Sequence, residues 1–186
     1  MNTNDQIGNI ALTRPDGSQT SLAHYRGKVL LVVNVASKCG LTPQYAGMEK
    51  MYQDRQAEGL VILGFPTGNF REQEFDTDQE IAQFCAMNYG VSFPILSKIS
   101  VAGDDQHALY TNLIAALPLA TGAEEFRQKM QQHKVSLAPA PDILWNFEKF
   151  LLNREGQVVA RFAPDVEVGD ARIVAAIEAE LAQPSA

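Results

Sequence analysis

Two apolar runs rich in β-branched residues are the features that most constrain the fold of this chain. The first, VLLVVNV, spans residues 29–35, and the second, LVILGF, spans residues 60–65. Each run is typical of a strand that is covered on both faces of a sheet. Between them, residues 45–58 have a helical composition that ends at Gly59. The order strand, helix, strand predicts a right-handed βαβ unit with parallel strands, and therefore an α/β fold.

The rest of the chain predicts further elements around this unit. Short extended runs on either side of Pro15-Asp16-Gly17 predict an N-terminal β-hairpin. We expect helices over 77–88, 107–117 and 170–181, extended segments at 93–96 and 99–101, an insertion with some helical character over 117–141, and a hairpin made of 145–152 and 157–162. Because no repeat or linker interrupts the pattern, residues 1–186 are expected to form a single domain.

Charge and composition exclude several classes of protein. The formal net charge is −7 and the basic residues are scattered, which argues against a nucleic acid partner. No basic segment precedes an apolar run at the N-terminus, and no run of 18 apolar residues occurs, so we expect a cytoplasmic protein without membrane insertion. The three histidines are dispersed and lack the spacing of a metal site, and no motif indicates a bound cofactor.

The two cysteines indicate thiol redox chemistry. Cys39 and Cys85 are too few for a disulfide scaffold, and their separation gives neither a CxxC motif nor zinc-ligand spacing. A thiolate can reduce a peroxide by attacking one of its oxygens, which leaves a sulfenic acid. Cys39 is expected to precede the first helix directly, where the helix N-terminus and Lys38 would favour a thiolate. Position alone leaves open the alternative that Cys39 is a small buried hydrophobic residue.

Four segments carry a resemblance to a known family. NVASKCGLTPQY, residues 34–45, resembles the peroxidatic motif of the glutathione peroxidases, with Cys39 at the place of the reactive residue. LGFPTGNFREQEF at 63–75 and WNFEKFL at 145–151 resemble the family blocks LGFPCNQFGxQEP and WNFxKFL in the same order. EIAQFCAMNYGVSFPI at 80–95 is similar to the cysteine-containing members that use thioredoxin. The resemblance covers nearly the whole chain and implies a thioredoxin-like fold with a central mixed sheet flanked by helices.

The resemblance also implies a polar site around the reactive thiol. In the family this site contains a tryptophan, an asparagine and a glutamine, which correspond to Trp145, Asn146 and Asn69 here. Asn69 is one methylene shorter than glutamine, Thr67 replaces a frequent cysteine, and Arg71 and Phe75 replace a glycine and a proline. Because such donors stabilise the charge that develops on the departing oxygen, we expect a slower peroxidase rather than an inactive one. Phe147, Glu148 and Lys149 are expected to serve a structural role.

The oxidised enzyme needs a reductant, and Cys85 matches the resolving cysteine of the thioredoxin-using members. If it lies far from Cys39, the helix over 77–88 must unwind locally, because a disulfide requires Cα atoms within about 7 Å. Simple packing within the helix is the alternative role for Cys85. We therefore expect a thiol peroxidase that reduces hydrogen peroxide and organic hydroperoxides and is recycled by thioredoxin, with glutathione as another possible donor.

Two other functions are also compatible with the sequence. One is a peroxide sensor that relays oxidation to a partner protein, and the other is a thioredoxin-fold binding module weakened by the changes at 67–69. Family members that form tetramers carry interface structure where this chain has its 117–141 insertion. Because the insertion does not resemble theirs, we expect a monomer or a weak dimer.

Overall fold

A four-stranded mixed sheet forms the centre of the computed structural model, which describes residues 3–185. Its strands are β3 (Val29–Val35), β4 (Leu60–Pro66), β5 (Lys149–Leu152) and β6 (Val158–Phe162), and their order across the sheet is β4-β3-β5-β6. β3 pairs in parallel with β4 and antiparallel with β5, and β6 pairs antiparallel with β5. The predicted central strands and their parallel pairing are confirmed.

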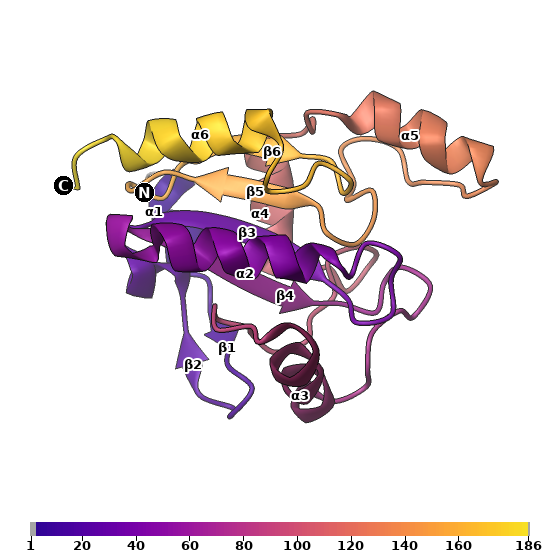
Figure 1. Cartoon of the computed structure of the whole chain (residues 1–186), viewed down its shortest axis with the longest axis horizontal. Helices are drawn as coiled ribbons and strands as arrows, with labels where there is room; N and C mark the ends of the chain where they lie inside the picture. Colours follow the sequence, from indigo (N-terminus) through magenta and orange to yellow (C-terminus); the bar gives the residue numbers. More distant parts are fainter. Residues whose placement is uncertain (1–2, 186) are drawn as a thin grey trace.

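Helices cover both faces of this sheet, as Figure 1 shows. The N-terminal hairpin is also present, with the two strands paired antiparallel. The remaining elements are α1 (Thr3–Gly8), β1 (Leu12–Thr13), β2 (Gln19–Thr20), the 3₁₀ helix η1 (Leu22–Tyr25), α2 (Gln44–Arg55), the 3₁₀ helix η2 (Gln56–Glu58), α3 (Asp78–Tyr89), α4 (Ala108–Ala116), α5 (Ala123–Gln132) and α6 (Ala171–Leu181). No helix within residues 3–185 is both long and apolar enough to cross a membrane.

Alternate residues of β3 contribute to two separate cores. Leu31 and Val33 pack with side chains of α2, α3 and α6 on one face of the sheet. Leu30 and Val32 pack with side chains of α1, β1 and α4 on the other face. Successive side chains of a strand point to opposite faces, so a strand buried on both faces is apolar throughout. This is why the β3 and β4 sequences are continuous apolar runs.

Several boundaries differ from the predictions. Residues 93–96 and 99–101 do not form a strand of the sheet; Ile95 makes one isolated bridge to Gly64, and Leu96 donates its N–H to the Gly64 carbonyl. Helix α1 was not predicted, because its sequence is short and mostly polar. The insertion at 117–141 contains α5, which agrees with the helical character expected there.

Candidate active site

Cys39 lies in a turn that connects the end of β3 to the start of α2. The side chain of Thr42 stabilises this turn, because its Oγ1 accepts the Cys39 N–H at 3.0 Å and donates to the Ala36 carbonyl at 2.8 Å. The Leu41 N–H points at the Cys39 sulfur, with 3.3 Å between nitrogen and sulfur. An amide hydrogen aimed at sulfur stabilises negative charge on it, as a thiolate requires. The thiol is free and 8% exposed.

The expectation that Cys39 directly precedes a helix is wrong. Helix α2 begins at Gln44, after turns over residues 40–43. Pro43 has no N–H to donate to the Cys39 carbonyl, so a regular helical hydrogen bond cannot form there. Lys38 also points elsewhere, with its Nζ 4.4 Å from the centre of the Phe75 ring. The Leu41 amide therefore takes the place of the helix N-terminus as the local donor.

Trp145 belongs to a turn that is tied to the end of β3. Asn34 Nδ2 donates to the Trp145 carbonyl at 3.0 Å, and the Asn34 carbonyl accepts the Phe147 N–H at 2.6 Å. The turn needs a left-handed conformation at Phe147, whose φ is 70°. Because Asn34 is part of the strand that leads to Cys39, these bonds hold Trp145 near the thiol. The Trp145 ring packs against Phe70, with 5.4 Å between ring centres.

Asn146 contacts Gln73, a residue that was not predicted to belong to the site. The side chain of Asn146 is fully buried, and its Nδ2 donates to Gln73 Oε1 at 3.1 Å, while its Oδ1 has no protein partner within the described residues. The Gln73 carbonyl also accepts the N–H of Lys38, the residue before Cys39. Gln73 thus joins Asn146 to the backbone beside the thiol. The REQEF segment supplied the signal, since it contains a glutamine four residues after Asn69.

The structure does not place Asn69 in the pocket of Cys39. Asn69 Oδ1 accepts the Val101 N–H at 2.7 Å, and Asn69 Nδ2 donates to Ser100 Oγ at 3.0 Å. A hydrogen bond with the Thr67 hydroxyl completes these contacts. Asn69 therefore joins its loop to residues 100–102. Its predicted role beside the sulfur remains a prediction.

A pocket of about 440 Å³ opens above Cys39 and is mostly apolar. Trp145 and Arg71 form part of its wall, and the Arg71 guanidinium lies 5.7 Å from the centre of the Trp145 ring. Arg71 replaces the glycine of the family pattern, so this departure brings a positive charge into the pocket. The other lining residues are Gly40, Leu41, Phe126, Lys129, Met130, His133, Val135 and Asp165.

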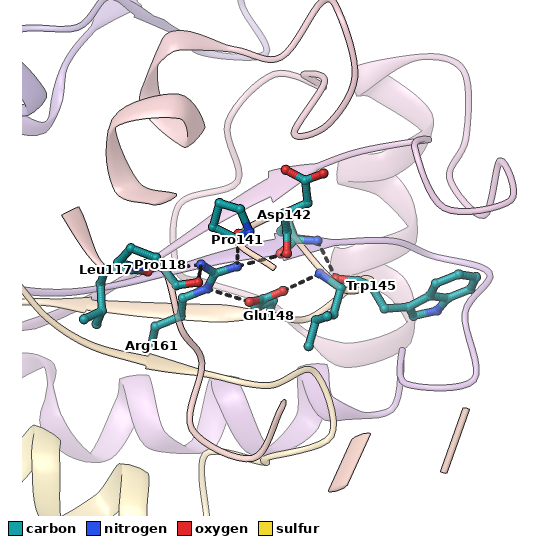
Figure 2. A network of polar contacts seen from close by, with 9 residues as sticks. Leu117, Pro118, Pro141, Asp142, Trp145, Glu148 and Arg161 are labelled. Carbon is teal, nitrogen blue, oxygen red and sulfur yellow. Dashed lines mark hydrogen bonds and ion pairs between the residues drawn. The ribbon is translucent and has the colours of Figure 1, made fainter. Parts of the chain in front are cut away.

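Residues of α5, within the insertion, also line this pocket. Arg161 anchors the insertion at both ends, as Figure 2 shows. Arg161 Nη1 donates to the carbonyls of Leu117 and Pro118, and its Nη2 donates to those of Pro141 and Asp142. Its Nε donates to Glu148 Oε1 at 2.7 Å, and Glu148 Oε2 accepts the Leu144 N–H. Both charged side chains are almost fully buried. This network supports the structural role expected for Glu148.

Cys85 lies in α3, and its thiol is free and 2% exposed. It belongs to the same buried cluster as Cys39 but does not line the Cys39 pocket. Burial raises the pKa of the Cys85 thiol, Tyr45 opposes this effect, and the charge of Glu74 adds to it. Cys85 is therefore protected and protonated in the reduced protein.

Lys149 is a fully buried cation beneath the Trp145 turn. Its Nζ donates to the Phe147 carbonyl at 2.6 Å and to the Pro164 carbonyl at 3.0 Å. Burial lowers the pKa of Lys149 to about 7, although the charges of Glu148, Asp165 and Glu167 oppose the shift. The role of this residue is thus more specific than packing, because it holds the backbone next to Phe147.

This pKa predicts how stability depends on pH. Between pH 7 and about 10.4 Lys149 is protonated in the unfolded chain but mostly neutral in the folded protein. Because the unfolded state then binds more protons, the free energy of unfolding rises with pH by at most about 1.4 kcal/mol per pH unit. Lys149→Met removes this contribution. Urea unfolding of both proteins at pH 6.5 and pH 9 checks it: wild type should gain stability relative to the variant as pH rises. Equal changes in the two proteins would contradict the shift.

Comparison with known proteins places these features in a family. The glutathione peroxidase family model matches residues 7–114. The chain is 46% identical to the thioredoxin/glutathione peroxidase BtuE of Escherichia coli, over 96% of this chain and 99% of that protein. It is 47% identical to the glutathione peroxidase-like peroxiredoxin gpx1 of Schizosaccharomyces pombe, over 80% and 82% of the two chains. The crystal structure of Trgpx in its apo form superposes with a TM-score of 0.68 at 32% identity, over 97% and 98%.

The family match and the structural match agree with what the sequence motifs implied. The family model includes the Cys39 turn and most of α4, and the BtuE relative extends the match through the Trp145 turn. Structural similarity over almost the whole chain confirms the thioredoxin-like fold. The chain therefore belongs to the glutathione peroxidase family, and it is a thiol peroxidase.

Proposed function

We propose that Cys39 is the thiol that attacks the peroxide. One observation carries this proposal: Cys39 lies at the edge of an apolar pocket, and the Leu41 N–H points at its sulfur. In the reaction the thiolate sulfur bonds to one peroxide oxygen and the O–O bond breaks. Cys39 becomes a sulfenic acid, and the second oxygen leaves as water or as an alcohol after it takes a proton.

Trp145 and Asn146 are proposed to support this step. Trp145 forms part of the pocket wall, so its indole borders the space that a peroxide would enter. Asn146 does not line the pocket, and it is hydrogen-bonded through Gln73 to the backbone beside Cys39. Hydrogen bond donors fixed near the sulfur stabilise the charge that moves to the departing oxygen. We propose that Asn69 supports the site indirectly. Its hydrogen bonds to Ser100 and Val101 fix its own loop, and Asn69 does not line the Cys39 pocket.

Cys85 is proposed to resolve the sulfenic acid by forming a disulfide with Cys39. Cys85 is buried in α3 and does not line the pocket of Cys39, so we expect the helix that carries it to move when the disulfide forms. Only Ile81 and Cys85 of the twelve residues in α3 are buried, and the helix is bounded by Thr77 at its start and by Gly90 at its end. A helix with so little buried surface costs little free energy to unwind. The limited burial of α3 supports the predicted local unfolding of this helix.

Thioredoxin is the proposed electron donor. The enzyme is proposed to act in the cytoplasm, where it would protect against oxidative stress. The E. coli relative is named for both thioredoxin and glutathione, so glutathione is the second candidate. A protein disulfide between Cys39 and Cys85 suits a dithiol donor, which reduces it through a mixed disulfide. We also propose that residues 1–186 form one catalytic domain and act as a monomer or a weak dimer.

Steady-state peroxide consumption tests the choice of donor. The wild-type protein is expected to turn over with thioredoxin and thioredoxin reductase, and to turn over more slowly with glutathione and glutathione reductase. A matched assay without protein corrects for direct reduction of peroxide by the thiols. Equal or faster consumption in the glutathione couple would contradict thioredoxin as the main donor. Fast sulfenic acid formation without turnover in either couple would favour a peroxide sensor.

A further inference from the structure

The resolving reaction requires a proton to move, and the thiols alone do not explain how. Burial raises the pKa of the Cys85 thiol in the folded helix, and a cysteine released from the helix, with an ordinary pKa of about 8.5, is still mostly protonated at neutral pH. In either form the thiol is a poor nucleophile until it loses its proton. The hydroxyl on the oxidised Cys39 is in turn a poor leaving group unless it takes a proton. A single acid–base group near both sulfurs would take the proton from the Cys85 thiol and give it to the hydroxyl that leaves Cys39.

Glu74 has the features of such a group. The side chain is 3% exposed, and its Oε1 accepts the N–H of Ser37 at 3.1 Å and the N–H of Phe75 at 3.0 Å. Its Oε2 has no hydrogen bond partner within the described residues, although it is buried. A buried carboxylate oxygen without a partner is costly, so it needs an explanation. An oxygen that is kept free to accept and release a proton provides one.

The position of Glu74 relates it to both cysteines. Ser37 lies two residues before Cys39, and the Lys38 N–H donates to the Gln73 carbonyl at 2.9 Å, so residues 73–75 pair with the backbone that leads to the reactive thiol. The charge of Glu74 also contributes to the raised pKa of Cys85. Helix α3 begins at Asp78, after this segment. Unwinding of α3 can therefore move Cys85 while Glu74 stays fixed beside Cys39.

We propose that Glu74 accepts the proton of the Cys85 thiol and delivers it to the hydroxyl that leaves Cys39, which rests on the proposed resolving role of Cys85. The Cys85 S–H bond breaks and its proton goes to the carboxylate. The sulfur–sulfur bond then forms as the S–O bond of Cys39 breaks, and the departing hydroxyl takes the proton from Glu74 and leaves as water. Cys85 is oxidised, the Cys39 sulfur is reduced, and Glu74 returns to its ionised form.

The surroundings of Glu74 suit this exchange. Burial raises the pKa of Glu74, while hydrogen bonds from Ser37 and Phe75 and the charge of Lys98 oppose the shift. A carboxyl group whose pKa lies closer to neutrality both accepts and releases a proton more readily. Glu74 also lines a polar cavity of about 380 Å³. The other residues that line this cavity are Lys38, Gly68, Glu72, Asp76 and Lys98.

The other titratable groups nearby fit the role less well. The Tyr45 hydroxyl is buried, and its pKa is raised well above the usual value, so it holds its proton at neutral pH. Glu72 and Asp76 are exposed, and neither makes a hydrogen bond to the Ser37–Cys39 backbone. Lys98 Nζ donates to the Phe75 carbonyl at 3.0 Å. Among the acidic side chains that line this cavity, Glu74 is the buried one.

The test is Glu74→Gln, which keeps the shape of the side chain and an oxygen that can accept the Ser37 and Phe75 N–H groups, but removes the proton-accepting charge. Glu72→Gln in the same cavity is the matched control. Reduced proteins are mixed with one equivalent of hydrogen peroxide and quenched with acid at set times. Mass spectrometry then measures the Cys39 sulfenic acid and the Cys39–Cys85 disulfide separately.

Glu74→Gln should form the sulfenic acid at the wild-type rate but form the disulfide about 100-fold more slowly at pH 7. The deficit should shrink as pH rises, because hydroxide then removes the Cys85 proton directly. Glu72→Gln should match wild type in both steps. Normal disulfide formation in Glu74→Gln would overturn the inference, and so would equal slowing of both steps, which indicates a structural role alone. A wild-type protein that forms sulfenic acid but no disulfide would overturn the role of Cys85 itself.

Discussion

Replacement of Cys39 by serine is expected to lower peroxide turnover by a factor of about 10³ or more. A serine hydroxyl does not ionise near neutral pH and is a far weaker nucleophile toward a peroxide oxygen than a thiolate. The Leu41 N–H and the apolar pocket would remain, but they act only on charge that the sulfur supplies. The measurement is peroxide consumption in the thioredoxin couple, with wild type assayed at the same concentration.

Folding has to be separated from chemistry in this experiment. Cys39 is 8% exposed, and serine differs from cysteine by one atom, so the variant should unfold at a urea concentration close to that of wild type. A folded Cys39→Ser protein that keeps more than a tenth of wild-type turnover would contradict the assignment of the attacking thiol. It would then point to Cys85 as the residue that reacts with peroxide.

The second large effect is expected for Cys85→Ser. This variant should rapidly consume about one equivalent of peroxide per protein and then show no thioredoxin-driven turnover, because Cys39 still reacts but no protein disulfide forms for thioredoxin to reduce. With excess peroxide the sulfenic acid should then progress more slowly to sulfinic acid, which uses a further equivalent of peroxide, since no second thiol removes it. Stopped-flow measurement of the first turnover and mass spectrometry of the final state record both results.

The first turnover itself serves as the internal control for Cys85→Ser. Loss of both the first and the later turnovers would indicate a folding defect, and thermal unfolding of the variant would detect it. Continued thioredoxin-driven turnover at the wild-type rate would show instead that Cys85 only packs within α3. In that case the local unfolding of α3 would have no place in the reaction.

The sheet and most helices were predictable because their signals are local. The β3 and β4 runs report burial on both faces, and α3 has a capping box in which Thr77 and Glu80 exchange hydrogen bonds. The start of α2 at Gln44 lies one residue from the predicted start at 45, whereas the expectation that Cys39 directly precedes the helix was wrong, because turns over residues 40–43 separate them. Helix α1 is too short and polar to show a period.

The site was predictable in part. The motif identified Cys39 and Trp145, which meet in one pocket, whereas Asn69 bonds to residues 100–102 instead. Gln73 and Glu74 were not predicted as site residues, because their partners Asn146 and Ser37 lie more than thirty positions away in the chain. The same is true of Arg161, whose bonds to the ends of the insertion depend on the folded arrangement of the β5–β6 hairpin. The family block contains Gln73 and Glu74, but spacing within a sequence does not identify the distant partners of these residues.

The most direct test of the central claim is to trap the sulfenic acid and locate it. Reduced Cys85→Ser protein is treated with one equivalent of hydrogen peroxide in the presence of a dimedone-type reagent that reacts with sulfenic acids, and the adduct is mapped by mass spectrometry. Cys39→Ser serves as the matched control. The account predicts a stoichiometric adduct on Cys39 and no adduct in the control. An unmodified Cys39, or an adduct on Cys85 in the control that forms as fast, would contradict it.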